Sequence, residues 1–484
     1  MFPLTIALSR TAKQFARAPA MLDEEETWGA HGVSIARLAA SLAARGLARG
    51  DRIAIIGRNS PAQARALHAC YWGGYLPVPL NWRLSPREIA DQLADCEPKL
   101  VVSDDAFAGL VPADLRERRV SWSELAAPSQ SADPIDHAEL TTDEPALLLY
   151  TGGTTGRAKG VVLSHGNIVA NALQVSDDMR FSRHSRYLHV APMFHSADLL
   201  GTAVTILGGA HAFLPDFSPQ AFVDAVDRHG VTHTMLPPTA IHCLLDGQHK
   251  PKNGTLERLI YGSSAMDANA IVAACERLQG VTLLQGYGLT ETSPLLTVLG
   301  GDAHRRIMAG EVLLANSAGR ALPGVELRLV DGEVFARGPN IAQTYWNRPD
   351  ETGQAFQEGW FRTGDIGRFD DAGNLFLLGR TKDMIVTGGE NVYAIEVEKV
   401  LTIHPDIREA AVIGLPDATW GEIVTAVIVP ANSPIEEDEI IRHCREHLGG
   451  FKVPRRIVWR EELPRSALGK VLKHELKKNM DDAE

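Results

Sequence analysis

The chain has 484 residues, of which 45% are hydrophobic and 22% charged, and its formal net charge at pH 7 is −12. This length exceeds what one hydrophobic core supports and predicts two or three domains of ordinary globular composition. The acidic charge argues against a nucleic-acid partner, because nucleic acids favour basic protein surfaces.

The first third of the chain alternates between helical and extended patterns. Its first residues include Arg10, Lys13 and Arg17 but no acid before Asp23; a transit peptide can look like this, although the first amphipathic helix of a folded domain is favoured. Helical spacing follows at 34–45 and 61–71, and strands are predicted at 51–57, 77–80, 99–103 and 146–150. Such alternation predicts an α/β fold, with mostly parallel sheets and helices on both faces. The polar stretch 112–143 is expected to cross the surface.

A second pattern begins after residue 379. It predicts a helix at 395–401, strands at 409–414 and 423–430, and a helix at 434–447. About 100 residues are enough for a small α+β domain. We therefore expect a large N-terminal domain at 1–379, a hinge at 380–382 and a C-terminal domain at 383–484.

The cysteines and the lengths of the apolar runs limit the cellular compartments in which the protein is expected. Five cysteines are scattered without a Cys-x-x-Cys pair, which fits reduced thiols in a cytoplasmic protein and argues against disulfides or a zinc site. No apolar run approaches the ~20 residues of a transmembrane helix.

Residues 150–160 read Tyr-Thr-Gly-Gly-Thr-Thr-Gly-Arg-Ala-Lys-Gly and resemble a loop that wraps a polyphosphate. Glycines can turn backbone N–H groups inward, threonines add hydroxyl donors, and a lysine adds a cation. The residues concerned are Gly152, Gly153, Gly156, Thr151, Thr154, Thr155 and Lys159. The spacing is not that of a Walker A loop, which argues against a phosphotransferase of that type. Taken alone, the stretch could equally be a surface turn.

Four further motifs follow in order. They are Tyr287-Gly288-Leu289-Thr290-Glu291-Thr292, Thr363-Gly364-Asp365, the run from Gly379 to Asn391, and Leu463-Pro464-Arg465-Ser466-Ala467-Leu468-Gly469-Lys470. With the glycine-rich loop, the set resembles the adenylate-forming enzymes: acyl-CoA synthetases, luciferases and peptide-synthetase adenylation domains. The resemblance runs from Trp28 to about Lys473. It is strongest to fatty-acyl and to aryl-CoA ligases of the 4-coumarate, feruloyl and benzoate types.

The resemblance implies a two-step reaction. ATP and a small-molecule carboxylic acid form an acyl-adenylate and pyrophosphate, and the thiol of coenzyme A then displaces AMP. Anions meet or part in both steps, so cations and N–H groups must neutralise developing charge. ATP, Mg²⁺ and coenzyme A are the implied cofactors. The C-terminal domain is implied to be a mobile lid hinged at Lys382, and a homodimer is left open.

The resemblance also assigns roles to residues. Lys470 is expected to carry the adenylation step, although most lysines in such a basic tail are merely solvated. Glu291, beside the Thr290 hydroxyl, is expected to hold Mg²⁺; a glutamate at a helix N-terminus is the alternative. The other expected ATP- or AMP-binding residues are Thr151, Gly152, Gly153, Thr154, Thr155, Gly156, Lys159, Gly262, Ser263, Ser264, Gly286, Tyr287, Gly288, Thr290, Asp365 and Arg380.

Two binding regions complete the expected site. Gly388, Gly389, Trp420 and Phe451 match positions that contact coenzyme A in relatives. His195 is expected among the catalytic residues and beside the acyl pocket, with a satisfied core histidine as the alternative. The acyl pocket is assigned to His195, Ser264, Gly286 and Gly288. These residues are small or neutral, which favours an apolar monocarboxylate, aromatic or fatty.

The chain departs from its relatives at three places. Ala158 and Ala394 stand where relatives usually have proline, and segment 325–338 is shortened to a hairpin with an Asp331-Gly332 turn. None of these changes removes a functional group.

Two alternatives to a CoA ligase stay open: transfer of the acyl group to a carrier protein or amine, and a non-catalytic acyl-nucleotide binding protein. The presence of Lys470 and Glu291 argues against the second.

Overall fold

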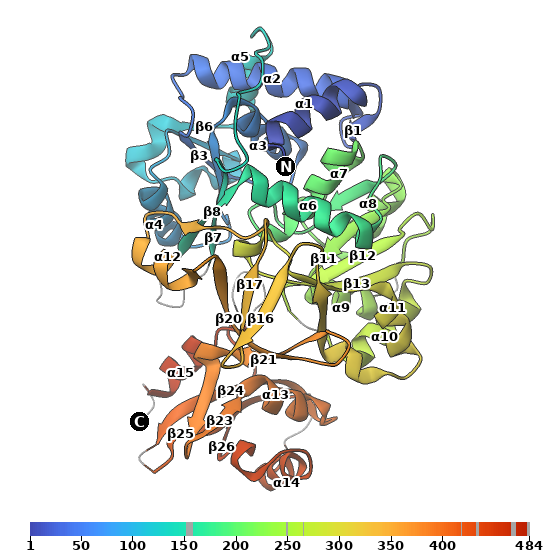
Figure 1. Ribbon diagram of the computed structural model, residues 1–484, viewed down its shortest axis with the longest axis vertical. Coiled ribbons are helices and arrows are strands. Elements are labelled where there is room, and N and C mark those ends of the chain that lie inside the picture. Colours follow the sequence, from blue (N-terminus) through green and yellow to red (C-terminus); the bar gives the residue numbers. More distant parts are fainter. Residues whose placement is uncertain are drawn as a thin grey trace. The chain divides into compact units, whose positions relative to one another are not determined.

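The computed structural model describes residues 1–151, 158–247, 250–264, 266–417, 419–431, 435–465 and 471–481. The chain forms two compact units (Figure 1). Unit 1 comprises Met1–Leu327 and Ala336–Arg362, and unit 2 comprises Arg328–Phe335 and Thr363–Glu484. Within the described residues, no helix is both long and apolar enough to cross a bilayer.

Unit 1 contains a large, mainly parallel sheet, as the alternating pattern predicts. Its order is β2-β1-β10-β9-β11-β12-β13-β14-β15, and it is parallel from β1 to β13 and antiparallel at β2, β14 and β15. The bounds are β1 Pro19–Met21, β2 Glu26–Thr27, β9 Arg186–His189, β10 Ala210–Phe213, β11 His233–Leu236, β12 Arg258–Gly262, β13 Thr282–Tyr287, β14 Thr297–Leu299 and β15 Ser317–Ala321.

Two smaller sheets complete unit 1. The first is parallel, in the order β4-β3-β5-β6, with bounds Leu76–Pro79, Arg52–Ile56, Leu100–Ser103 and Arg119–Val120. The second is antiparallel, in the order β18-β8-β7, with bounds Thr344–Tyr345, Lys159–Ser164 and Pro145–Thr151.

Several helices of unit 1 begin at sequence signals, and two of these signals were not recognised in the sequence. The helix expected at 34–45 begins earlier, at Trp28, because the Thr27 side chain caps its N-terminus. The stretch 112–143 contains β6 and a helix capped by a Ser121–Glu124 capping box. The helices are α1 Leu4–Gln14, α2 Trp28–Ala44, α3 Pro61–Gly73, α4 Pro86–Cys96, α5 Trp122–Ser129, α6 His165–Met179, α7 Gly201–Leu207, α8 Pro219–His229, α9 Pro238–Asp246, α10 Ala268–Arg277, α11 Gly301–Met308 and α12 Pro349–Ala355.

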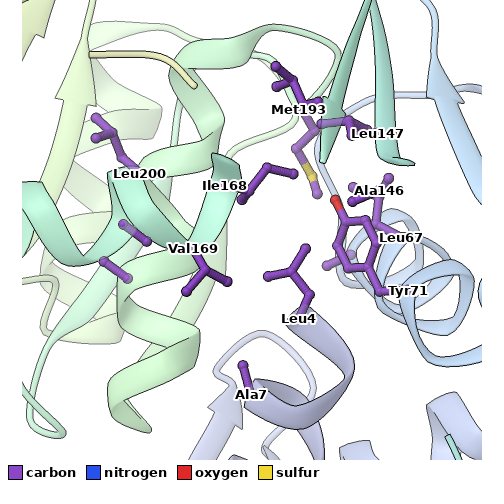
Figure 2. Packing of buried hydrophobic residues seen from close by; sticks show 14 of the residues in the cluster. Leu4, Ala7, Leu67, Tyr71, Ala146, Leu147, Ile168, Val169, Met193 and Leu200 are labelled. Atoms are coloured by element: carbon purple, nitrogen blue, oxygen red, sulfur yellow. The ribbon is translucent and has the colours of Figure 1, made fainter. Parts of the chain in front are cut away.

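The large sheet separates two hydrophobic cores, because successive side chains of a strand point to opposite faces. On β9, Tyr187 enters the core that includes α1, α2, α3, α6 and α7, whereas Leu188 enters the core with α8 to α11. Figure 2 shows part of the first core, to which α1, α3 and α6 contribute Leu4, Ala7, Leu67, Tyr71, Ile168 and Val169. The N-terminal segment is therefore a packed helix of the folded unit.

Unit 2 is a small α+β unit around an antiparallel sheet. The sheet order is β23-β22-β25-β24, and β26 pairs in parallel with β25. The bounds are β20 Trp360–Phe369, β21 Leu375–Arg380, β22 Met384–Thr387, β23 Glu390–Tyr393, α13 Ala394–Ile403, β24 Ile407–Asp417, β25 Gly421–Pro430, α14 Glu437–His447, β26 Arg456–Trp459 and α15 Lys473–Asp481. Helices α13 and α14 cover one face and α15 the other.

The hairpin β16 (Glu326–Val330) and β17 (Glu333–Arg337) has the predicted tight turn, with φ of 50° at Asp331 and 80° at Gly332. The central part of this hairpin belongs to unit 2 by its contacts. The expected hinge residue Lys382 falls in the short helix Thr381–Asp383 that follows β21. The hinge at 380–382 and the boundary at 379 stay predictions.

Candidate active site

The strands β7 and β8 place the glycine-rich loop in a hairpin. Thr151 pairs with Lys159 in the antiparallel ladder, so the loop joins two antiparallel strands and does not lead from a strand into a helix. The predicted residues Gly152, Gly153, Thr154, Thr155 and Gly156 lie outside the described residues. Their contact with phosphate stays a prediction.

Lys159, Tyr345 and Glu291 come together at this end of the hairpin. Strand β18 pairs with β8, and the Nζ atom of Lys159 lies 5.3 Å from the centroid of the Tyr345 ring. The Tyr345 hydroxyl donates a 2.7 Å hydrogen bond to Oε1 of Glu291, which is 8% exposed. Burial and the adjacent carboxylate raise the pKa of Tyr345, so the phenol stays protonated and remains a donor.

Glu291 has the chemistry expected of a magnesium ligand. The turn Thr290–Thr292 places a hydroxyl directly beside the buried, oriented carboxylate. Mg²⁺ takes oxygen ligands and usually keeps waters and substrate phosphates, so one carboxylate is sufficient. Within the described residues, no group of three or more His, Cys, Asp or Glu side chains could hold a metal ion, so a multi-histidine or thiolate site is not found there.

His195 is held beside this motif by the turn that follows it. The backbone N–H of Ala197 donates to Nδ1 of His195 at 3.2 Å, and burial lowers the pKa of His195. The ring is therefore neutral with its proton on Nε2. The next residue, Ser196, has its Oγ 3.3 Å from Oγ1 of Thr290, which connects the His195 turn to the Glu291 motif.

A cavity beside His195 contains most of the predicted acyl pocket. Its lining residues are His195, Ser196, Ala197, Leu200, Met235, Ile260, Tyr261, Gly262, Ser263, Gly286, Gly288, Pro294 and Leu295. These described lining residues carry no charged side chain. Ser264, which the sequence analysis placed in the pocket, is exposed and does not line this cavity.

The glycines of this cavity are required by close backbone approaches. A Cβ atom at Gly262 would lie 2.6 Å from the carbonyl oxygen of Gly286, and one at Gly288 would lie 2.1 Å from that of Pro294. Two buried asparagines hold the opposite wall: Asn171 and Asn340 both donate to the carbonyl of Leu295, at 2.8 and 2.9 Å. At the glycines and at Leu295, the cavity wall is therefore backbone held by close contacts and hydrogen bonds.

In unit 2, the two predicted nucleotide contacts Asp365 and Arg380 contact each other. They are paired across β20 and β21, and Nε of Arg380 lies 2.8 Å from Oδ1 of Asp365. The Asp365 side chain is 7% exposed, and the Thr363 hydroxyl accepts from its backbone N–H at 3.1 Å. A carboxylate held in this way presents a fixed acceptor, which suits the hydroxyls of a ribose.

Three of the four predicted CoA-binding residues are neighbours. Gly388 and Gly389 have φ of 59° and 85°, and the N–H of Gly388 donates to the carbonyl of Trp420 at 2.8 Å. Arg455 stacks on the Trp420 ring at 3.9 Å. Phe451 is exposed on the short helix Gly450–Lys452.

Lys470 lies outside the described residues, so its catalytic role stays a prediction.

Comparison with known proteins identifies the family. The model of the AMP-binding enzyme family matches residues 8–346, and that of the AMP-binding enzyme C-terminal domain matches residues 396–470. The chain belongs to the AMP-binding enzyme family. The resemblance found in the sequence motifs and the α/β fold class with a small C-terminal domain are therefore confirmed.

Relatives of this AMP-binding enzyme are CoA ligases. The chain is 36% identical over 474 residues to an indoleacetate–CoA ligase of Aromatoleum aromaticum, covering 92% of this chain and 91% of that protein. It is 36% identical over 459 residues to a feruloyl-CoA synthase of Amycolatopsis sp, covering 92% of both. Its activity class is thus AMP-forming acid–CoA ligase, with ATP, Mg²⁺ and coenzyme A as cofactors.

A solved structure has the same fold across the full length. ATP-bound MatB from Rhodopseudomonas palustris matches with a TM-score of 0.88 at 29% identity, covering 100% of both chains. The fold of unit 1 and unit 2 is therefore that of an acyl-CoA synthetase.

Sequence reasoning missed Tyr345, which contacts both Lys159 and Glu291. No motif in the sequence analysis includes it, and its role depends on the pairing of β18 with β8. Its position two residues before Asn347, in a Tyr-Trp-Asn-Arg-Pro run, is the one signal that could have directed attention to it.

Proposed function

We propose that this enzyme activates an aromatic or arylalkyl monocarboxylic acid through an acyl-adenylate and transfers the acyl group to coenzyme A. The observation that carries the choice of acid is the uncharged lining of the cavity beside His195. A second carboxylate in the substrate would need a cation there, and the described lining residues offer none. The names of the feruloyl and indoleacetate relatives favour an aromatic acid over a fatty one.

Roles follow for the residues around the cavity. Lys159 and the loop at 151–157 are proposed to hold the ATP phosphates, and Glu291 with Thr290 to hold Mg²⁺, which when bound neutralises phosphate charge. The neutral His195 is proposed to donate from Nε2 toward the carboxylate oxygen as the acid is activated. Asp365 and Arg380 are proposed to bind the ribose, and Lys470 to reach the reacting oxygens when the lid closes.

Release of AMP and formation of a thioester test this proposal. The purified enzyme is given ATP, Mg²⁺, coenzyme A and, in turn, benzoates, phenylacetates, cinnamates and C4 to C16 fatty acids. We expect AMP and an acyl-CoA from the aromatic acids, with less from the fatty acids. Pyrophosphate release without thioester would instead support transfer to a carrier protein or amine. No turnover of any acid would contradict the proposal.

A cytoplasmic location is proposed on the strength of the cysteines. All five are free thiols, and Cys70, Cys96 and Cys444 are buried. Thiols of this kind persist in a reducing compartment.

A further inference from the structure

A second cavity lies on the other side of the short helix Ser196–Leu200. This helix contributes Ala197 and Leu200 to the wall of the first cavity and Asp198 and Leu199 to that of the second. His195 lines both cavities, so the two are adjacent at this residue. The second cavity has a volume of about 50 Å³. That is room for roughly three to five water-sized groups, so it suits the tip of a substrate.

The wall of the second cavity is largely apolar, but it includes more histidines than that of the first cavity and also the carboxylate of Asp198. Among its lining residues are His68 and Tyr71 from α3, His189 from β9 and His211 from β10. His68 keeps partial exposure although hydrophobic core residues surround its helix, because it faces the cavity. Figure 2 shows the Tyr71 hydroxyl directed toward Met193, which lines the same cavity.

A chain of hydrogen bonds leads from a buried carboxylate to His68. Oε2 of Glu26 lies 2.9 Å from Nδ1 of His31, and Nε2 of His31 lies 2.9 Å from Nδ1 of His68. Arg65 and the Ser34 hydroxyl also contact the Glu26 carboxylate, at 3.1 and 3.0 Å. The carboxylate end of this chain is thus firmly held.

The protons along this chain have one consistent arrangement. Partial burial opposes ionisation of Glu26, but its hydrogen bonds with His31 and Ser34 and the positive charge of Arg65 lower its pKa, so the carboxylate accepts a hydrogen bond from Nδ1–H of His31. Burial lowers the pKa values of His31 and His68, so both rings are neutral. Nε2 of His31 is therefore an acceptor, and Nδ1 of His68 must donate to it. Nε2 of His68 is left as a bare acceptor.

A second chain of hydrogen bonds at this cavity, through His189 and His211, has a hydrogen-bonding partner at each end. Nδ1 of His189 lies 2.6 Å from Asp198, Nε2 of His189 lies 3.0 Å from Nδ1 of His211, and Nε2 of His211 lies 3.1 Å from the Thr205 hydroxyl. In contrast, Nε2 of His68 makes no hydrogen bond within the described part of the chain, and neither does the Tyr71 hydroxyl. Burial raises the pKa of Tyr71, so its hydroxyl keeps its proton.

The cavity therefore presents one unused acceptor and one unused donor. A hydroxyl group can satisfy both, because it donates one hydrogen bond and accepts others. A carboxylate cannot donate to His68, and it would lie close to the Asp198 carboxylate. An alkyl group in this cavity would exclude water from Nε2 of His68 without providing a hydrogen-bond donor, and desolvation of an unpaired acceptor costs free energy.

We propose that the second cavity binds a hydroxyl group carried by the substrate acid at the end remote from its carboxylate, with Nε2 of His68 as the acceptor and the Tyr71 hydroxyl as the donor. This proposal rests on the proposed function, because it places the acid between the His195 region and His68. Recognition of the substrate hydroxyl is then due to two side chains of α3, which contains none of the nucleotide-binding motifs.

Matched acids and a His68 variant test the proposal. The acids are 4-hydroxyphenylacetate, 3-(4-hydroxyphenyl)propanoate and 4-hydroxycinnamate, each compared with its 4-H and 4-methoxy analogues by kcat/KM for acyl-CoA formation. For at least one set we expect the hydroxy acid to be preferred by about 10- to 100-fold over both analogues, because only it donates to His68. In His68→Leu this preference should fall to within about 3-fold, with the 4-H acid used as well as by the native enzyme.

Two control variants separate recognition from folding. His68→Gln keeps an acceptor oxygen at this position and should retain part of the preference, whereas His233→Gln changes a histidine that lines neither cavity and should retain all of it. If His68→Leu does not fold, the preference of the native enzyme still decides the matter.

Distinct outcomes would overturn the proposal. Equal use of hydroxy, 4-H and 4-methoxy acids, with thioester formed, would refute it while leaving the proposed function intact. No AMP release from any acid would instead refute the proposed function itself.

Discussion

At the residue scale, the Tyr345 hydroxyl orients the Glu291 carboxylate through a neutral hydrogen bond. Lys159 lies against the face of the same ring, so one side chain contacts both the predicted metal ligand and a predicted phosphate ligand. A buried carboxylate with a fixed oxygen binds a metal ion at lower entropic cost than a mobile one. Tyr345 is therefore a positioning residue whose effect should be specific to Mg²⁺ and ATP.

Removal of the Tyr345 hydroxyl tests this role. Tyr345→Phe should raise KM for Mg·ATP and the Mg²⁺ concentration for half-maximal rate by about 10- to 150-fold, since a hydrogen bond to a charged group contributes about 1.5–3 kcal/mol. Its KM for the acid should change by less than 2-fold. Steady-state kinetics with Mg²⁺ and ATP varied separately provide the measurement.

Tyr187 supplies a matched control for this substitution. It is also a fully buried tyrosine, but its hydroxyl has no hydrogen-bond partner in the described structure. Tyr187→Phe should leave the kinetics unchanged and the stability equal or slightly higher. If both variants raise KM for Mg·ATP equally, the effect of Tyr345 is not due to its hydrogen bond with Glu291.

At the scale of elements, the acyl cavity is shaped by the ends of β12 and β13 and by the turn after β13. The glycines at these ends differ in what surrounds them. A Cβ atom at Gly286 would lie 2.7 Å from Cδ2 of Leu295, the end of a flexible side chain, whereas one at Gly288 would meet a backbone carbonyl. The first contact can be relieved by a side-chain movement, and the second requires the backbone to shift.

Two alanine substitutions should therefore have different effects. Gly286→Ala should fold, with a loss of less than about 1.5 kcal/mol in the free energy of unfolding, but its kcat/KM for the bulkier acids should fall at least ~10-fold relative to benzoate. Gly288→Ala should be destabilised by at least ~2 kcal/mol and lose activity on all acids. Denaturant unfolding and the acid panel measure both. Uniform loss on all acids in a stable Gly286→Ala variant would contradict this assignment of the cavity.

The same elements show how far local sequence determines structure. The strands at 51–57, 99–103 and 146–150 and the helix at 61–71 were predicted to within two residues at each end, because apolar runs and a Ser60-Pro61 cap mark them locally. The antiparallel partner of β7 was not predicted, since pairing depends on residues far along the chain. This pairing places Thr151 and Lys159, which flank the glycine-rich loop, side by side.

At the scale of the whole molecule, buried histidines make the stability of unit 1 sensitive to acid. Burial lowers the pKa values of His165 and His233 to about 4, whereas an unfolded histidine titrates near 6.5. Between these values the unfolded chain binds more protons than the folded one, so stability rises with pH. The contribution is fully present above pH 6.5 and is lost as the pH falls toward 4.

Chemical denaturation at two pH values measures this effect. Between pH 7.5 and pH 5, each of the two histidines should reduce the free energy of unfolding by about 2 kcal/mol. In His233→Gln, which can keep a donor to the carbonyl of Met179, the loss over the same interval should be about 2 kcal/mol smaller. A pH dependence identical to that of the native chain would show that His233 does not titrate in this range.

The family and the α/β class could be predicted from the motifs and the alternating pattern alone, as could the candidate site residues that lie within those motifs. Motifs such as Tyr287–Thr292 and Thr363–Asp365 are contiguous, so their functional groups can be recognised from the sequence without knowledge of the fold. Which distant residues meet depends on the fold: Tyr345 contacts Glu291, Arg380 contacts Asp365, and hydrogen bonds run from Glu26 through His31 to His68. Each contact joins residues brought together by strand pairing or helix packing. A lone Tyr, His or Glu has no local pattern that reveals its partner, because hydrogen bonds depend on distance in space and not on order in the chain.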